Sequence, residues 1–222
     1  MRRLLLTSHA LGSQSSTKLV LQFIKEFPAR SILGYIPNAQ ATPDRARLKE
    51  KFSKLKRMGC NPVLIDLKLL KGVKLMKKLG VVDIIFIGGG NVFHLLKILR
   101  KSGFTKILPK LLDRGMGYIG SSAGSYVACP TIEAATWKPS PSDRNFVKIK
   151  NLKALNLVPF LLTAHFEKKY RFIISDAASR TKYPIVALYD TQAVYVKGSK
   201  YKVLGTGRRE FFNGFKSSES IR

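Results

Sequence analysis

Most apolar residues of the chain fall into short runs bounded by Gly, Pro or charged residues, and these runs alternate with longer stretches rich in Lys and Arg. The runs are nearly continuous in Val, Leu and Ile, which is typical of strands buried on both faces of a parallel sheet. The longer stretches have the pattern of surface helices. Strands are predicted over 3–7, 31–36, 62–67, 81–87 and 118–119, and helices over 19–27, 43–59, 92–101, 105–114 and from Ala123 onward.

The pattern changes in the last third of the chain, where short apolar runs at 184–188, 193–196 and 201–204 are separated by turn residues. Such runs predict antiparallel strands that complete the sheet. Strands and helices that alternate with short connections predict a three-layer α/β/α fold with a mostly parallel sheet and antiparallel strands near the C-terminus. We expect a single domain over 1–216 and a flexible tail over 217–222.

Length and cysteine usage narrow the class of protein. The 222 residues suffice for one α/β domain. No apolar run approaches the roughly 18 residues that a membrane helix needs, so no membrane association is expected. The two cysteines, Cys60 and Cys129, lack C-x-x-C spacing, which predicts a reducing compartment, the cytoplasm, and no disulfide framework.

The charge balance is strongly basic, with 40 Lys and Arg against 13 Asp and Glu and a formal net charge of +27. Such a field attracts nucleic acids, anionic membranes and acidic substrates. The basic residues are scattered through every predicted helix, as at 49–51 and 77–78. This dispersion favours solvated helix faces over a dedicated nucleic-acid site, which stays open as an alternative.

The strongest chemical signal is the segment 120–124, which reads Gly-Ser-Ser-Ala-Gly and contains G-x-S-x-G centred on Ser122. It lies between a predicted strand and a predicted helix, the context that a nucleophile elbow requires. The two flanking glycines leave room for the strained turn, and the N–H of Ala123 is a natural oxyanion donor. The same pattern also permits close packing or phosphate binding, so it does not establish catalysis alone.

A second signal is the loop 88–91, Gly-Gly-Gly-Asn, which also follows a predicted strand and precedes a helix. It fits neither the P-loop nor the dinucleotide-binding motif. Adjacent strand ends of an α/β sheet share one crevice, where ligands bind. The N–H of Gly90 could therefore supply a second oxyanion donor, although a simple tight turn explains the loop nearly as well.

The chain has three histidines as candidates for a catalytic base, His9, His94 and His165. His94 falls inside a predicted helix among apolar neighbours and is interpreted as a packing or surface residue. His9 follows the first strand and could line the crevice. His165 ends an apolar run downstream of the serine, where it could take the proton of a strand-end nucleophile.

Several sequence blocks follow one another in a recognisable order, at 88–91, 120–125, 128–132, 155–160 and 165–166. Together they resemble peptidase family S51, whose members include peptidase E, an aspartyl dipeptidase, and cyanophycinase. The resemblance covers roughly 84–203. It implies a fold related to class I glutamine amidotransferases, with a serine in place of their elbow cysteine.

The same resemblance assigns roles to individual residues. It implies that Ser122 is the nucleophile and His165 the general base, and that the site uses no metal and no organic cofactor. Gly90 and Ala123 would donate to the oxyanion. The substrate would contact Gly89 and Asn91.

The third member of the triad is where this sequence departs from the family. Peptidase E proper carries an aspartate five residues past the Pro-Thr-Ile block, and that position is Trp137 here. An acid is needed to orient the imidazole. Glu133 is the first choice, Asp143 the second and Asp190 the third. The departure weakens an expectation of strict aspartyl specificity more than one of hydrolysis.

The expected function is hydrolysis of a small peptide through an acyl-enzyme, in the manner of a dipeptidase, by a monomer or homodimer. A basic pocket would suit an acidic N-terminal residue, with Arg171 or Arg180 as candidates for its charge. The alternatives are a cyanophycinase-like hydrolase, an esterase, or a non-catalytic basic protein that binds nucleic acid on the same fold.

Overall fold

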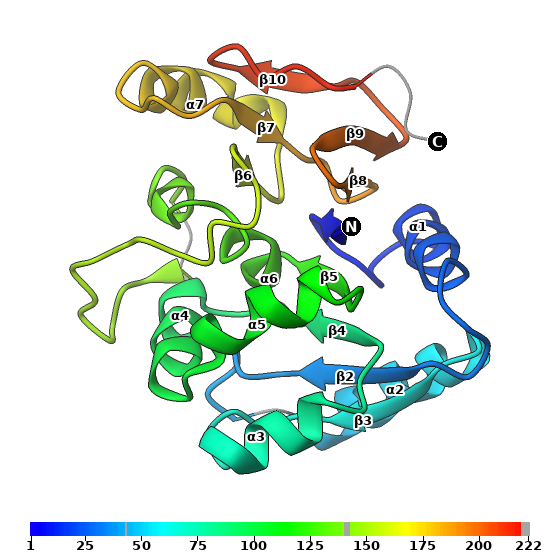
Figure 1. Cartoon of the computed structure of the whole chain (residues 1–222). Coiled ribbons are helices and arrows are strands. Elements are labelled where there is room, and N and C mark those ends of the chain that lie inside the picture. The colour runs from blue at the N-terminus through cyan, green and yellow to red at the C-terminus, as the bar shows by residue number, and fades with distance from the viewer. Residues whose placement is uncertain (43, 140–142, 219–222) are drawn as a thin grey trace.

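The computed structural model describes residues 1–42, 44–139 and 143–218. A seven-stranded sheet runs through the molecule in the order β3-β2-β4-β5-β1-β8-β9 (Figure 1). Its first five strands in that order are parallel, and the two at the other edge are antiparallel. The predicted fold class is therefore confirmed. The strands are β1 (Arg3–Thr7), β2 (Ile32–Ile36), β3 (Asn61–Leu64), β4 (Ile84–Ile87), β5 (Gly117–Ser121), β8 (Gln192–Lys197) and β9 (Lys200–Gly205).

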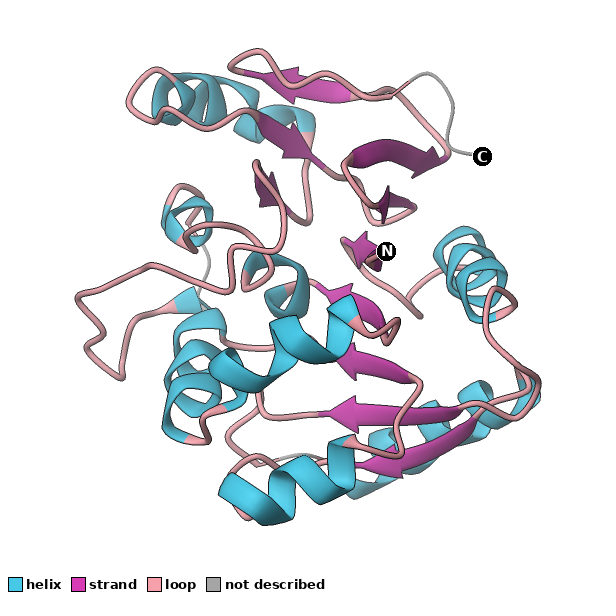
Figure 2. Cartoon of the chain, in the orientation of Figure 1, coloured by secondary structure: helices cyan, strands magenta, loops and turns pink. Residues whose placement is uncertain are grey.

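Helices cover both faces of this sheet and bury two separate apolar clusters (Figure 2). One cluster packs α1 and α2 against alternate strand residues such as Leu5 and Leu33. The other packs α3 to α6 against residues of the opposite face, such as Leu4 and Ile85. The alternation follows from the two-residue period of a strand. The helices are α1 (Gln14–Ile24), α2 (Arg45–Arg57), α3 (Gly72–Leu79), α4 (Val92–Lys101), α5 (Phe104–Asp113), α6 (Ala123–Tyr126) and α7 (Arg171–Ala178).

A second, three-stranded sheet lies beside the first and was not predicted. It consists of β6 (Leu161–Thr163), β7 (Ile185–Ala187) and β10 (Glu210–Phe212), in the order β10-β7-β6. The sequence predicts β7 as part of the main sheet, but it pairs with β6 and β10 instead. A buried apolar strand fits a central position in either sheet, so hydrophobicity alone does not select its partners.

The flexible tail predicted over 217–222 is described only at Ser217 and Ser218. Ser218 N donates to Tyr201 O at 2.7 Å, and Ser217 Oγ accepts from Val203 N at 3.4 Å, so both serines lie along β9. Residues 219–222 of that tail, and 140–142 of the Pro- and Ser-rich loop, lie outside the described residues.

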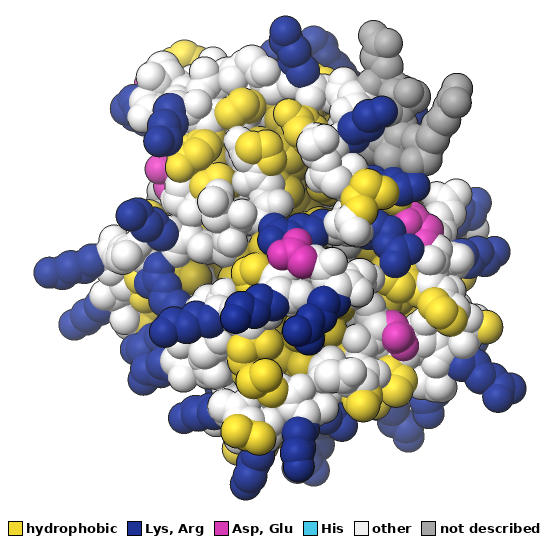
Figure 3. All heavy atoms as spheres, in the orientation of Figure 1, with side chains coloured by type: hydrophobic (Ala, Val, Ile, Leu, Met, Phe, Trp, Pro, Cys, Tyr) yellow, Lys and Arg dark blue, Asp and Glu magenta, His cyan; other side chains and the backbone are white. Residues whose placement is uncertain are grey.

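Basic side chains are spread over the visible face of the molecule and do not gather into one patch (Figure 3). This agrees with the scattered pattern of Lys and Arg along the sequence. In the part of the chain that the structure describes, no helix is long and apolar enough to span a membrane.

Candidate active site

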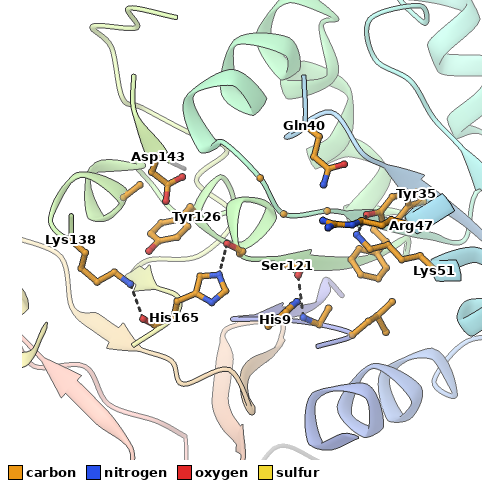
Figure 4. Close-up of a pocket in the computed structure, with 18 of the residues that line it drawn as sticks. His9, Tyr35, Gln40, Arg47, Lys51, Ser121, Tyr126, Lys138, Asp143 and His165 are labelled. Carbon is orange, nitrogen blue, oxygen red and sulfur yellow. Dashed lines mark hydrogen bonds between the residues drawn. The ribbon is translucent and has the colours of Figure 1, made fainter. Parts of the chain in front are cut away.

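A cavity of roughly 610 Å³ opens at the carboxyl ends of β1, β4 and β5. Because these strands are parallel neighbours, the loops that follow them meet at one edge of the sheet. Residues 88–90 come from the loop after β4, and Ser122 comes from the turn after β5. His9 comes from the loop after β1 and lies in the cavity near His165 (Figure 4). Arg47 and Lys51 of α2 line one side of the cavity.

Ser122 occupies a strained turn between β5 and α6, with φ 49° and ψ −110°. A non-glycine residue rarely adopts such a positive φ unless its surroundings enforce it. They do so here by close packing. A Cβ on Gly124 would lie 2.2 Å from Ile87 O, and one on Gly120 would lie 2.7 Å from Gly124 O. The G-x-S-x-G spacing thus builds a nucleophile elbow that holds the serine at the cavity.

The elbow serine contacts His165, and His165 contacts Asp190. His165 Nε2 lies 3.0 Å from Ser122 Oγ, and its Nδ1 lies 2.6 Å from Asp190 Oδ1. The two nitrogens of one imidazole therefore join a hydroxyl and a carboxylate, as in a Ser-His-Asp triad. His165 follows β6 and Asp190 follows β7, so both come from the small sheet.

Ser8, at the end of β1, ties this pair to the main sheet. Its Oγ donates to Asp190 Oδ1 at 2.7 Å and accepts from His165 N at 2.7 Å. Burial raises the pKa of Asp190, but hydrogen bonds from His165 and Ser8 outweigh burial and lower that pKa to about 2. Asp190 is therefore a carboxylate at neutral pH, as an imidazolium partner requires.

Glu133, the first choice for the acidic member, does not contact His165. It lies in a 3₁₀ turn, η1 (Glu133–Thr136), and its Oε1 accepts from Thr181 Oγ1 at 2.8 Å. The structure contradicts this assignment, because the turn directs the carboxylate toward α7 and away from the cavity. Asp143, the second choice, lines the cavity but is not the residue bonded to His165. The third choice, Asp190, holds that position.

The glycine loop approaches the serine closely. A Cβ on Gly89 would lie 3.3 Å from Ser122 Cβ, and one on Gly90, whose φ is 140°, would lie 2.5 Å from Ala39 O. Only glycine fits the second position without strain. Among the described residues, neither Gly89 N nor Gly90 N donates to a protein acceptor, which leaves both amides for a ligand. Ala123 is the first residue of α6 and directly follows Ser122, so its N–H lies at the N-terminus of that helix.

Asn91, predicted as a substrate contact, is used structurally. Its side chain caps α4 by accepting from His94 N at 2.8 Å, and its Nδ2 donates to Arg144 O at 2.9 Å. It is not among the residues that line the cavity, and a substrate contact at Asn91 stays a prediction.

Of the remaining histidines and arginines considered from the sequence, one lies at the cavity and the others do not. His9 lines the cavity, and its ring lies edge-on to the His165 ring with the centroids 6.0 Å apart. His94 stacks on Phe146 instead, as expected of a packing residue. Arg171 pairs with Glu210 and Arg180 with Asp176, so neither supplies charge to the cavity.

Three residues that the sequence did not single out complete the site: Ser8, Tyr126 and Lys138. Ser8 follows β1 directly, so its place at the end of a parallel strand was the one available signal. Tyr126 and Lys138 form hydrogen bonds with the backbone of the His165 segment, which lies far from them along the chain. No sequence motif predicts these contacts. In the described ranges, no group of three or more His, Cys, Asp or Glu side chains lies close enough to form a metal site.

The sequence and the fold resemble those of known peptidases. The chain matches peptidase family S51 over residues 4–204. It is 28% identical to an uncharacterised peptidase of Listeria monocytogenes over 196 residues, which cover 84% of this chain and 93% of that protein. It is 31% identical to peptidase E of Nostoc sp. over 169 residues, 74% of this chain and 66% of that protein.

Two crystal structures share the fold. One, of a Listeria monocytogenes EGD-e protein assigned to peptidase E, has a TM-score of 0.75 and 24% identity, and the match covers 93% of this chain and all of that one. The other, of a peptidase from an acI-B1 Actinobacterium, has a TM-score of 0.70 and 16% identity, with 100% and 96% covered. The fold is thus a three-layer α/β/α fold of the peptidase E type. The chain belongs to peptidase family S51.

Proposed function

We propose that the chain is a serine peptidase in which Ser122 is the nucleophile, His165 the general base and Asp190 the residue that orients His165. The proposal is carried by the paired contacts of the His165 ring, 3.0 Å to Ser122 Oγ and 2.6 Å to Asp190 Oδ1. A low pKa at Asp190 supports it, since an ionised carboxylate stabilises the imidazolium that forms during the reaction.

The reaction begins when His165 Nε2 takes the proton of Ser122 and Oγ attacks the carbonyl carbon of the scissile bond. The N–H groups of Gly90 and Ala123 stabilise the oxyanion of the tetrahedral intermediate. His165 then gives its proton to the departing amine, and the acyl group stays on Ser122. A water molecule, deprotonated by His165, attacks this ester and releases the acid.

The cavity suits a small peptide with an acidic N-terminal residue. Its roughly 610 Å³ matches a ligand of modest size. Arg47 and Lys51 on α2 supply positive charge, and Lys51 Nζ is steadied by donating to Tyr35 Oη at 3.1 Å. Asp143 and Glu167, which also line the cavity, suit the α-ammonium group of a free N-terminus. The name of the Nostoc relative, peptidase E, agrees with a peptidase.

We include a cytoplasmic location in this proposal, because the two cysteines of the chain are not linked by a disulfide. Cys60 and Cys129 are both free and buried. Burial raises their pKa to about 11 and about 12 respectively, so neither is reactive at neutral pH. A pair of unlinked thiols is expected in a reducing compartment.

A fluorophosphonate probe and a substrate panel test the function together. We expect the probe to label Ser122 in the wild-type chain and to leave Ser122→Ala unlabelled. The panel compares Asp-Leu and Leu-Leu dipeptides, N-acetylated Asp-Leu, β-aspartyl-arginine and a p-nitrophenyl ester. Preference for free Asp-Leu supports the proposal. If the probe does not label the wild-type chain and the chain instead binds DNA with an affinity that falls as salt rises, the proposal is overturned.

A further inference from the structure

The backbone around His165 is held by side chains. After β6 the chain turns, and His165 adopts a φ of 53°. Ala164 N donates to Tyr126 Oη at 3.0 Å, and His165 N donates to Ser8 Oγ at 2.7 Å. Lys138 Nζ donates to both carbonyls of this dipeptide, to Ala164 O and, at 3.2 Å, to His165 O. One ammonium group therefore supplies half of the four contacts.

Lys138 reaches this position from the segment after η1, on the cavity wall (Figure 4). Its Nζ lies 5.5 Å from the centre of the Tyr170 ring. Burial lowers the pKa of Lys138 to about 8, and the charges of Asp143, Asp190 and Glu167 oppose that shift. The ammonium is thus partly buried, close to three carboxylates, and directed at the backbone of the proposed general base.

We propose that Lys138 is a positioning residue for His165, whose ammonium group holds the Ala164 and His165 carbonyls and thereby keeps the imidazole between Asp190 and Ser122. The inference rests on the proposed function in taking Ser122 and His165 as the reacting pair. It goes beyond that function, because Lys138 acts on the base through the backbone and need not touch the substrate.

The physical argument is one of enforced conformation. A histidine with positive φ relaxes unless its surroundings fix it. Loss of the ammonium would leave two carbonyls without their donor and free the peptide to rotate, and the ring would move with it. A displacement of about 1 Å at a catalytic group can lower the rate by about 100-fold. A lysine that only bound substrate would instead change KM.

The experiment compares Lys138→Met, which keeps the aliphatic stem, with Lys138→Arg, which keeps the charge and the donors. Lys106→Met, on the exposed side of α5, is the matched control. The readouts are the rate of fluorophosphonate labelling of Ser122, kcat and KM on the best dipeptide of the panel, and the melting temperature. We expect Lys138→Met to lower labelling and kcat by about 10- to 100-fold, with KM within about twofold, because it removes charge-assisted hydrogen bonds.

Rescue and pH separate positioning from a general structural role. Lys138→Arg should recover most of the labelling rate. In the wild-type chain the rate should fall as pH rises through about 8, where Lys138 loses its proton. The Arg variant should lack this fall because a guanidinium stays charged. The facing carboxylates, Asp143, Asp190 and Glu167, favour the protonated ammonium, and the Tyr170 ring covers it.

A second variant covers the case in which Lys138→Met does not fold. Lys138→Cys treated with 2-bromoethylamine regains a lysine-like amine, and the buried Cys60 and Cys129 are protected from the reagent. Its labelling rate should rise on treatment and should fall at a lower pH than in the wild type, because the thioether makes the amine less basic.

Each other outcome contradicts the proposal in a distinct way. Equal labelling by wild type and Lys138→Met, or a wild-type pH profile that Lys138→Arg leaves unchanged, would overturn the role of Lys138 and spare the proposed function. A tenfold rise in KM with kcat unchanged would replace positioning by direct substrate contact. A wild-type serine that never reacts with the probe would overturn both.

Discussion

The two sheets contribute different parts of the candidate triad. Ser122 follows a strand of the seven-stranded sheet, whereas His165 and Asp190 follow strands of the three-stranded sheet. The serine side is marked by one local motif, in which Gly120 packs on Gly124, although Gly124 itself packs on Ile87 O of the neighbouring strand. The histidine side is built from partners far away along the chain, such as Ser8, 182 residues from Asp190. The comparison shows a serine on a turn that a local motif marks and a histidine whose position depends on contacts between the two sheets.

Exposure differs between the two sides as well. The residues around the elbow, Ser121 and Ala123 among them, are buried. The side chains of His165 and Asp190 are 46% and 50% exposed. A half-exposed pair gains little rigidity from packing, so its geometry depends on hydrogen bonds from Ser8 and, as proposed above, Lys138. Variants on the two sides should therefore fail for different reasons.

The largest effect is expected at the serine side. Ser122→Ala removes the nucleophile and should lower turnover by about 10⁶-fold, as loss of the serine does in a comparable triad. The fold should survive because the glycine contacts, not the hydroxyl, hold the elbow. Peptidase kinetics and a melting curve measure both. Activity within tenfold of wild type would contradict the assignment.

On the other side, His165→Ala should be almost as damaging, while His94→Ala should leave turnover unchanged. Members of a triad act as a unit, so the double variant Ser122→Ala with His165→Ala should be little worse than either single one. Steady-state kinetics on the four proteins decide the matter. If the losses in turnover of the two single variants add in the double variant, His165 acts independently of Ser122. The proposed coupling of the residues from the two sheets would then be wrong.

A smaller effect is expected at the acid. Asp190→Asn keeps the shape but removes the charge, and should lower turnover by about 10⁴-fold, as in a comparable triad. Glu133→Gln is the matched control: it alters a contact with Thr181 outside the cavity and should leave turnover unchanged. Parallel measurements of kcat compare them. A severe loss in Glu133→Gln with none in Asp190→Asn would reverse the assignment that the geometry supports.

The smallest effect is expected at the junction of the sheets. Ser8→Ala removes one hydroxyl that bonds both Asp190 and His165 N. The expected loss in turnover is about tenfold, the scale of one hydrogen bond to a charged group. Ser175→Ala, on the exposed face of α7, is the control and should behave as wild type. If Ser8→Ala has no effect, the small sheet holds its pair without help from β1.

The strand pattern shows how far the sequence carries the fold. The strands predicted at 3–7 and 118–119 correspond to β1 and β5. They could be predicted because parallel strands buried on both faces are continuously apolar in sequence. Four elements outside that signature were missed, one of them α7 (Arg171–Ala178). β6 and β10 are each three residues long, and α3 exposes Val73 and Met76, which blurs its helical period.

The sequence by itself indicated the strained turn at Ser122 and the glycine loop, because both are short glycine motifs between a strand and a helix. Only glycine fits the close approaches of Gly124 to Ile87 O and of Gly90 to Ala39 O. The sequence also limited the base to three histidines. Only the tertiary structure decided that Asp190, and not Glu133, meets His165, and that Asn91 caps a helix. The physical reason is distance along the chain: a carboxylate at any strand end can in principle reach an imidazole, and which one does depends on how the two sheets pack.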